Sequence, residues 1–197
     1  MAGAFGVRYY ATLYGEKRLI GPVERIDAPA ALDVRPAAEV ELTHLTGLLG
    51  PREHRLSLRA RAEGSECLIA WHEGAVAGYS WINRRVIVFV GDRLASLPSE
   101  GAYTFFSFVW PDYRGQKVFQ VLTEAVYRRL QQEGFEFCCN MVDRDNAGSI
   151  GARAKFGVVY RPAPVLKLPG LRPFVLGRGL PFGLAGSPDP EEQPAES

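Results

Sequence analysis

The sequence predicts a single α/β domain, and three observations support that prediction. Residues 67–82 contain two strand-prone runs separated by a Glu-Gly pair, the signature of a tight hairpin turn. Residues 117–133 carry apolar side chains at helical spacing. Strand-like runs at 102–110 and 135–142 flank this helix, which gives the strand–helix–strand order of an α/β protein.

Both element types are predicted before the hairpin. Residues 1–30 are assigned to an N-terminal extension, in which runs at 7–13 and 18–26 could pair as a hairpin across Gly15-Glu16. The elements that follow are a short strand over 31–35, a helix over 37–49 and a more polar helix over 52–62.

The same patterns predict the elements after the hairpin. They are a strand over 86–90, a loop over 91–101, a short helix over 146–156, a strand that begins at Val158 and a strand over 173–176. We assign 31–186 to the folded domain. Residues 187–197 are acidic and proline-rich, so we expect a disordered tail there.

The composition excludes several classes of protein. The chain has 197 residues, with 23 basic and 22 acidic side chains and a net charge of +1, so we expect no broad electrostatic binding to nucleic acid. We expect neither a signal peptide nor a transmembrane segment, and therefore a cytoplasmic protein. The three cysteines, Cys67, Cys138 and Cys139, lack the spacing of a metal site or a disulfide framework, so we expect no metal and buried, reduced thiols.

The most informative segment lies between 109 and 119. A strand stops at Pro111, and a basic, glycine-containing loop then leads into the helix. The N–H groups at the start of a helix have no intrahelical acceptor, and the helix dipole is positive there. Together they bind anions such as a pyrophosphate, so we predict an anion site at this loop.

The segment from Tyr103 to Tyr160 resembles the GNAT superfamily of acyl-CoA-dependent N-acyltransferases. Arg114-Gly115 matches the start of the family's Arg/Gln-x-x-Gly-x-Gly/Ala loop, Asn146 follows the second strand, and Phe156-Gly157-Val158 closes the last helix. The resemblance implies a mixed, mostly antiparallel, splayed sheet with helices on both faces. It also implies transfer of an acyl group, most simply acetyl, from acyl-CoA to an amine of a small molecule or peptide by direct attack in a ternary complex.

The resemblance further assigns residues to the binding of acyl-CoA. These are Phe108, Val109, Trp110, Arg114, Gly115, Gln116, Lys117, Val118, Phe119, Asn146 and Ser149. The backbone of 108–110 would pair with the pantetheine arm, and the Val109 N–H would hold the thioester oxygen. Asn146 would contact pantetheine or cap the last helix, and Ser149 would be a small packing residue.

The loop departs from the family pattern at both glycine positions, which hold Lys117 and Phe119. Lys117 could block the groove or bring a cation to the pyrophosphate, and we favour the second because ammonium groups are common phosphate partners. Phe119 would fit if its ring turned into the core beneath the helix.

Neither of the family's usual acid–base groups is present. The position of the glutamate base falls near Tyr103, and the position of the tyrosine acid holds Arg153. We name Tyr160 and Tyr103 as substitute catalytic residues; the alternative for both is an aromatic residue of the core. For Arg153 we favour a solvated helix face over contact with an acidic acceptor or a CoA phosphate.

Two alternatives to an acetyltransferase remain open. One is an acyltransferase that takes long-chain acyl groups from CoA or an acyl-carrier protein, which would suit the loop substitutions. The other is a non-catalytic module that binds acyl-CoA or a protein partner, which would suit the missing acid–base groups. The apolar segment 166–184 could be a lid, a lipid-facing patch or the arm of a homodimer.

Overall fold

The computed structural model describes residues 6–29 and 31–176, and within them the chain forms three β-sheets and four α-helices. The tail predicted to be disordered, 187–197, lies outside the described residues. So does the part of the apolar segment that follows residue 176.

The bounds of the elements are as follows. The helices are α1 (Glu39–Leu48), α2 (Pro51–Ala62), α3 (Val118–Gln132) and α4 (Ala147–Ala154), and a 3-10 turn, η1, spans Pro111–Tyr113. The main sheet contains β2 (Thr12–Arg18), β3 (Leu32–Pro36), β4 (Glu66–His72), β5 (Ala75–Asn83), β8 (Gly101–Val109), β9 (Phe137–Asp143) and β10 (Val159–Pro162). The other strands are β1 (Arg8–Tyr10), β6 (Val86–Phe89), β7 (Asp92–Ser96), β11 (Val165–Lys167) and β12 (Phe174–Val175).

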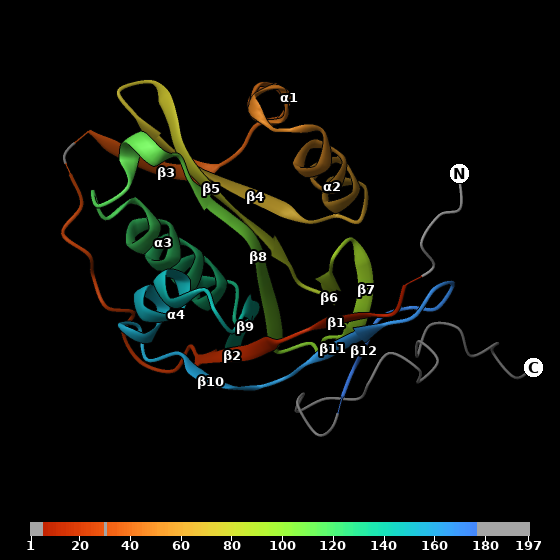
Figure 1. The fold of residues 1–197 in the computed structure, drawn as a ribbon. Coiled ribbons are helices and arrows are strands. Elements are labelled where there is room, and N and C mark those ends of the chain that lie inside the picture. The colour runs from red at the N-terminus through yellow and green to blue at the C-terminus, as the bar shows by residue number, and fades with distance from the viewer. Residues whose placement is uncertain (1–5, 30, 177–197) are drawn as a thin grey trace, which may run out of the picture.

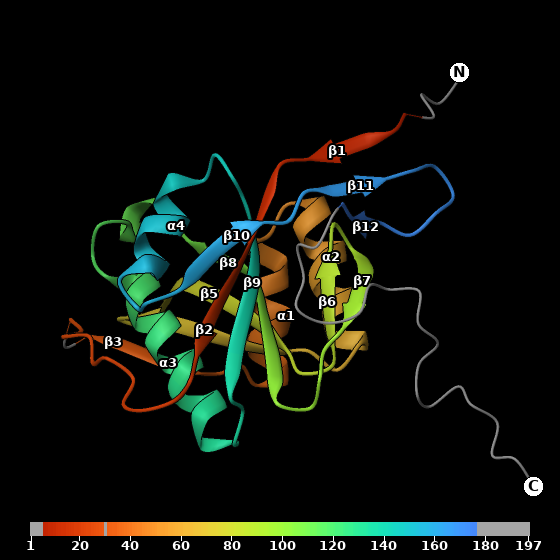
Figure 2. The same ribbon diagram turned by 90° about the horizontal axis from the view of Figure 1, so that it is seen from below.

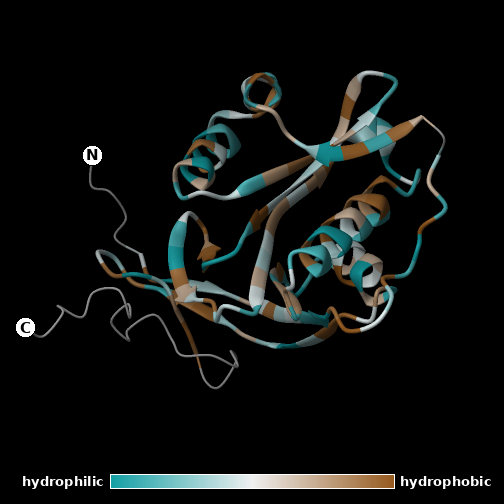
Figure 3. Cartoon of the chain, turned by 180° about the vertical axis from the view of Figure 1, so that it is seen from behind, coloured by the Kyte–Doolittle hydropathy of each residue, from teal (hydrophilic) through white to brown (hydrophobic). Residues whose placement is uncertain are grey.

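The main sheet has seven strands in the order β10-β2-β9-β8-β5-β4-β3 and is antiparallel except where β8 lies beside β9. Helices α1 and α2 cover one face, and α3 and α4 cover the other (Figure 1). Figure 3 shows α2 as largely hydrophilic, which agrees with its prediction as the more polar helix. This is the predicted mixed, mostly antiparallel sheet with helices on both faces.

Helix α3 packs on the sheet through one stripe of side chains. Val118, Leu122, Val126 and Leu130 recur every four residues and are all at most 2 % exposed. The stripe begins at Val118 and does not include Phe119. Phe119 is half-buried and belongs to the side of the helix that faces α4.

The predicted N-terminal hairpin does not form. Gly15 and Glu16 lie inside β2, which runs between β9 and β10 and pairs antiparallel with both (Figure 2). The predicted run over 7–13 overlaps β1 and the start of β2, but the run over 18–26 is wrong, because no strand forms at 19–26. The actual partners come from the far end of the chain, and sequence periodicity carries no information about pairing at that separation.

Strands β8 and β9 pair only at their beginnings. The register runs from Gly101 with Phe137 to Thr104 with Asn140 and then stops. Beyond that point β8 continues along β5 and β9 continues along β2, so the two strands part. A bulge at Phe106 (φ 45°) shifts the pairing of β8 with β5 just after the parting point. The splay expected of the sheet is therefore present.

The elements predicted between 31 and 162 are confirmed within a few residues, with one exception. The hairpin of β4 and β5 turns at Glu73 and Gly74, which have φ of 51° and 81°, as a tight turn of this kind requires. The exception is the predicted loop over 91–101, which contains β7. This strand pairs with β6 in a small two-stranded sheet.

Candidate functional site

The loop between β8 and α3 leaves the start of α3 without a side-chain cap. Lys117 is the N-cap residue, and the first intrahelical bond runs from the Val121 N–H to the Lys117 carbonyl. The N–H groups of Val118, Phe119 and Gln120 precede that bond. Uncapped donors at the positive end of a helix are the geometry predicted for an anion site.

Lys117 has a left-handed backbone (φ 60°) at the position where the family motif has its first glycine. Its Nζ donates to the Asp27 carbonyl (3.2 Å), in the segment between β2 and β3. A hollow of about 300 Å³ lies here, lined by Asp27, Ala28, Pro29, Gly115, Gln116 and Lys117. The ammonium group is thus held at the wall of a hollow beside the helix terminus.

Two further side chains of the loop form hydrogen bonds with the loop's own backbone and with the end of β8. Arg114 Nε donates to the Val109 carbonyl (3.3 Å), and Gln116 Nε2 donates to the Asp112 carbonyl (2.9 Å). Both residues are exposed. They fix the path of the backbone from the end of β8 to the start of α3.

Of the three residues predicted to pair with pantetheine, Val109 presents its backbone to the gap beside β9. The Trp110 N–H donates to the Ala77 carbonyl (3.0 Å), and Val109 is the Cα partner of Gly78. Hydrogen-bonded and non-hydrogen-bonded pairs alternate in an antiparallel ladder, so the N–H of Val109 faces away from β5. The same alternation directs the backbone of Phe108 to β5, as for Trp110.

Asn146 caps α4. Its Oδ1 accepts a hydrogen bond from the Ser149 N–H (3.0 Å), which confirms the predicted capping role. Asn146 is exposed and Ser149 is half-buried, so both lie at the outer end of the helix. A contact with pantetheine stays a prediction.

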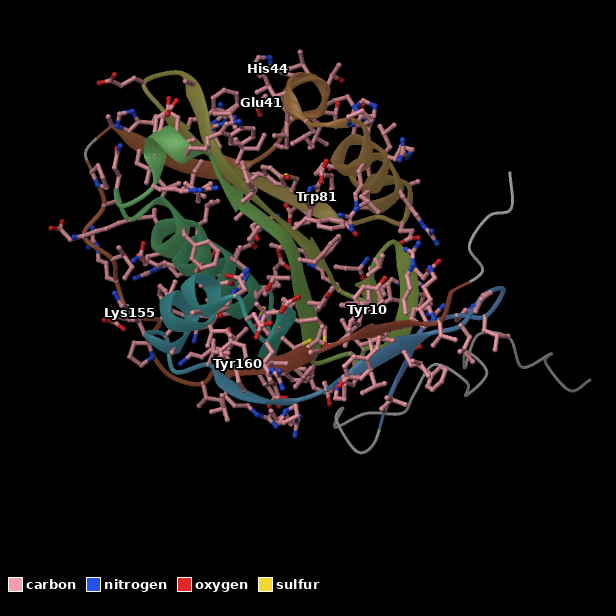
Figure 4. All side chains as sticks on the ribbon, in the orientation of Figure 1. Tyr10, Glu41, His44, Trp81, Lys155 and Tyr160 are labelled. Carbon is pink, nitrogen blue, oxygen red and sulfur yellow. The ribbon has the colours of Figure 1, made fainter. Side chains whose placement is uncertain are left out.

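A row of four residues crosses the sheet at the point where β8 and β9 part. Thr104, Asn140, Gly15 and Tyr160 are successive Cα partners from β8 to β10. Cross-strand partners share a face, and here it is the face under α3 and α4. We call these residues the polar row. Figure 4 shows Tyr160 on β10 beneath α4.

Arg153 of α4 reaches the polar row and is 5 % exposed. Its Nη1 donates to Thr104 Oγ1 (3.1 Å) and its Nη2 to Ser107 Oγ (3.1 Å). The bulge at Phe106 turns Ser107 onto this face of β8. Ser107 Oγ also shares a hydrogen bond with Ser80 Oγ (2.8 Å). The prediction of a solvated helix face for Arg153 is therefore wrong, because this side of α4 packs against the sheet.

Among the described residues, no carboxylate pairs with Arg153. Its Nε has no hydrogen-bond partner there, and neither has the buried hydroxyl of Tyr160. The guanidinium lies over the Phe119 ring, 5.2 Å from its centroid. Phe119 thus fills space between α3 and α4 instead of turning into the core beneath α3.

The positive charge of Arg153 opposes the effect of burial on neighbouring acidic groups. Burial raises the pKa of Cys138 to about 11, and the Arg153 charge lowers it in part. Burial likewise raises the pKa values of Tyr103, Tyr127 and Tyr160, each partly offset by Arg153. The Tyr160 phenol is therefore protonated at neutral pH and able to donate a proton.

Tyr103 has the geometry of a core residue. It is 2 % exposed, its hydroxyl donates to the Val88 carbonyl (2.9 Å), and its ring stacks on Phe105 with centroids 5.4 Å apart. A hydroxyl already committed to a backbone carbonyl is poorly placed for proton transfer to a substrate. Of the two catalytic candidates, Tyr160 is the one whose hydroxyl is not committed to a backbone carbonyl.

A second hollow, of about 440 Å³, lies beside α1. It is lined by Ala31, Asp33, Arg35, Glu41, Trp71, Glu73 and Gly74. The His44 ring stacks over Trp71 with centroids 6.4 Å apart, and Figure 4 shows His44 and Glu41 on α1 above the sheet. None of the site residues predicted from the sequence lines this hollow.

Two kinds of feature are not found in 6–29 and 31–176. No helix there combines the length and the apolar character that crossing a membrane requires. No group of three or more His, Cys, Asp or Glu side chains there is arranged to hold a metal ion.

Most of the polar row was not predicted from the sequence, and Arg153 was predicted on the wrong side of α4. The sequence does contain a sign of a buried polar site: Thr104, Ser107 and Asn140 are polar residues within otherwise apolar or aromatic strands. Polar side chains at inward positions need partners, and an arginine one helix away could have been considered. The spacing alone did not indicate which strand faces were inward.

No protein-family model matches the chain, and no curated protein matches it. Solved structures with a similar fold include a GCN5-related N-acetyltransferase from Sphaerobacter thermophilus (TM-score 0.58, 14 % identity, 90 % of this chain and 55 % of that one). A tandem GNAT protein from the clavulanic acid biosynthesis pathway matches with a TM-score of 0.56 and 15 % identity, over 82 % of this chain and 54 % of that one. The aminoglycoside N-acetyltransferase AAC(6')-Iy in complex with CoA matches with a TM-score of 0.51 and 20 % identity, over 68 % of this chain and 91 % of that one.

At these identities the likeness establishes a shared fold. The chain spans about half the length of the first two of these structures, 55 % and 54 %.

Proposed function

We propose that this chain, which has the fold of the GNAT N-acetyltransferases, is an N-acyltransferase that uses acyl-CoA. The observation that carries the proposal is the parting of β8 and β9 beyond Thr104 and Asn140. Helix α3 packs on β8, and its N-terminus is uncapped. Parted strands offer unpaired backbone to the amides of a pantetheine arm, and the helix terminus suits its diphosphate.

The proposed reaction follows from these positions. The neutral amine attacks the thioester carbonyl carbon, the C–S bond breaks, and an amide forms while CoA leaves as a thiolate. The Val109 N–H, which faces the gap, would stabilise the charge on the carbonyl oxygen. The proton lost by the amine balances the one taken up by the thiolate, and Tyr160 is the proposed donor.

The described activities of similar structures support this reaction class. They are N-acetyltransferases, and one of them holds CoA. We propose acetyl as the simplest acyl group and an amine of a small molecule or peptide as the acceptor. A cytoplasmic location and a homodimer are proposals that rest on the sequence.

One observation favours a non-catalytic module instead. Lys117 and Phe119 occupy both glycine positions of the loop, and the Phe119 ring lies over Arg153 between α3 and α4. A ring in that position would narrow the channel for pantetheine. A module of this kind would bind CoA without turnover or bind a protein in its place.

Calorimetry with CoA and acetyl-CoA tests the proposal. We expect saturable binding of both, and at least a tenfold loss of affinity in Lys117→Glu, because the new carboxylate repels the diphosphate. The matched control is Lys155→Glu, on the exposed end of α4, which should bind CoA as the wild type does (Figure 4). Absence of binding by the wild type at millimolar CoA would overturn the proposal. Binding without release of thiol across a panel of amines would favour the non-catalytic module.

A further inference from the structure

The guanidinium of Arg153 is a buried charge without a counter-charge. The group has five N–H donors, and two of its nitrogens donate to the neutral hydroxyls of Thr104 and Ser107. The Nε has no partner, and no described carboxylate forms an ion pair with the residue. Burying an arginine in this way is unfavourable unless an anion accompanies it, so the site is complementary to an anion that arrives with a ligand.

Hydroxyl groups from two strands hold the Arg153 guanidinium in a fixed orientation. Thr104 and Ser107 fix both Nη atoms, and Ser80 holds Ser107 from β5. This bracing from two strands sets the plane of the guanidinium.

The guanidinium of Arg153 lies 5.2 Å from the ring centroid of Phe119, in the first turn of α3, but its hydrogen bonds go to the sheet. The uncapped donors at Val118–Gln120 follow the end of β8 and the η1 turn. Arg153 contacts Thr104 and Ser107 instead, where β8 and β9 begin to part. A donor that enters from α3 along Val109 would therefore bring its acyl end, and not its phosphates, to this guanidinium.

We propose that Arg153 binds a carboxylate at the end of the transferred acyl group, so that the donor is the CoA thioester of a short dicarboxylic acid. The inference rests on the proposed N-acyltransferase function and specifies its donor. The planar fork of Nε and Nη suits the two oxygens of a carboxylate. An acetyl group or a long alkyl chain would leave the charge unmatched.

The depth of the site favours a carboxylate on the acyl group over one on the acceptor. Arg153 is 5 % exposed and lies at the closed end of the gap, at the level of the last paired residues of β8 and β9. A carboxylate that reaches Arg153 must therefore belong to the acyl group of a CoA thioester that lies between β8 and β9. The amine acceptor has to meet the thioester from the open side.

Calorimetric affinities for four ligands test this inference: CoA, acetyl-CoA, malonyl-CoA and succinyl-CoA. We expect the wild type to bind malonyl-CoA or succinyl-CoA at least tenfold more tightly than acetyl-CoA. Arg153→Met has a similar volume and no charge, so it should abolish that ratio while affinity for CoA itself changes less than threefold. The control is Arg161→Met. Arg161 follows Tyr160 on β10, so its side chain points to the opposite face of the sheet, where its guanidinium lies 4.7 Å from the centroid of the Tyr14 ring. This variant should keep the wild-type ratio.

The wild-type ratio is informative even if Arg153→Met does not fold. Equal affinities of the wild type for acetyl-CoA and both dicarboxylic thioesters would overturn the inference. A folded Arg153→Met that still binds the dicarboxylic thioesters more tightly than acetyl-CoA would also overturn it. The same holds if the substitution changes only the KM of amine acceptors that carry a carboxylate. Failure of the wild type to bind CoA is a separate result, which would refute the proposed function itself.

Discussion

The ring of Tyr160 lies directly over Gly15, its register partner across β10 and β2. A Cβ atom placed on Gly15 would stand 2.5 Å from Tyr160 Cε1 and 2.7 Å from Asn140 Oδ1. Real Cβ atoms do not approach other heavy atoms so closely. Gly15 therefore allows β2 to pass beneath the aromatic ring, and both residues belong to the polar row.

Gly15→Ala should destabilise the protein, because the added methyl group must displace Tyr160 or Asn140. Overpacking of this kind costs about 1–3 kcal/mol of the free energy of unfolding. Urea denaturation measures it. The control is Gly47→Ala in α1, where no heavy atom lies within 4 Å of the added methyl group and alanine should be neutral or stabilising. Equal midpoints for wild type and Gly15→Ala would show that the ring is not fixed over β2.

Lys117→Gly should stabilise the protein. Lys117 has φ of 60°, and a left-handed backbone costs a residue with a Cβ about 1 kcal/mol relative to glycine. The hydrogen bond from Nζ to the Asp27 carbonyl is exposed, so its loss should matter little.

The matched control is Lys117→Ala, which also removes the ammonium group but keeps the Cβ atom. We expect it to lack the gain shown by the glycine variant in chemical denaturation. Identical stabilities for the two variants would mean that the backbone at 117 is unstrained.

Stability should fall in alkaline solution as buried thiols ionise. The pKa of Cys138 is raised from 9.0 to about 11 in the folded protein, so the unfolded chain loses this proton first. The contribution is fully present below pH 9 and is lost as the pH rises toward 11. At about 1.4 kcal/mol per pKa unit, the loss from this one residue is about 1–3 kcal/mol.

Urea midpoints at pH 8, 9, 10 and 11 measure this loss, with Cys138→Ala as the comparison. The variant should lose less stability than the wild type between pH 9 and 11. Buried tyrosines, whose pKa values are also raised, add a decline at higher pH in both proteins. Parallel pH profiles for the two proteins would contradict the burial of a protonated thiol at this position.

Glu66→Gln should lower the free energy of unfolding, because it removes an ion pair that links α3 to the sheet. Glu66 on β4 pairs with Arg84 (2.6 Å) and with Arg129 of α3 (2.7 Å), and both arginines also pair with Glu133. A partly buried network of this kind contributes about 1 kcal/mol, and salt screens it. The loss should therefore be largest at low ionic strength and shrink in 1 M NaCl. A substitution in the hairpin turn, Glu73→Gln, should show no salt-dependent change.

Local patterns predicted the elements well because their causes are local. The turn at Glu73 and Gly74 and the stripe on α3 each depend on residues a few positions apart. The resemblance to GNAT proteins added the splay between β8 and β9. The placement of β2 could not be predicted, because its partners lie far along the chain and a strand pattern does not name its neighbour.

The site was predicted in part. The helix terminus at Lys117 and the cap at Asn146 follow from short motifs, and the structure contains both. Arg153 could not be placed from the sequence, because its burial depends on which face of a two-turn helix meets the sheet. The bulge at Phe106, which brings Ser107 to that arginine, leaves no mark in the residue pattern.

The insertion of β2 between β9 and β10 also constrains the order of folding. During synthesis β2 leaves the ribosome before both of its neighbours, β9 and β10. The nascent chain must keep β2 unpaired, or held by another surface, until those two strands have emerged. Strands so far apart in the sequence pair slowly, so we expect the pairing of β2 with β9 and β10 to form last in refolding.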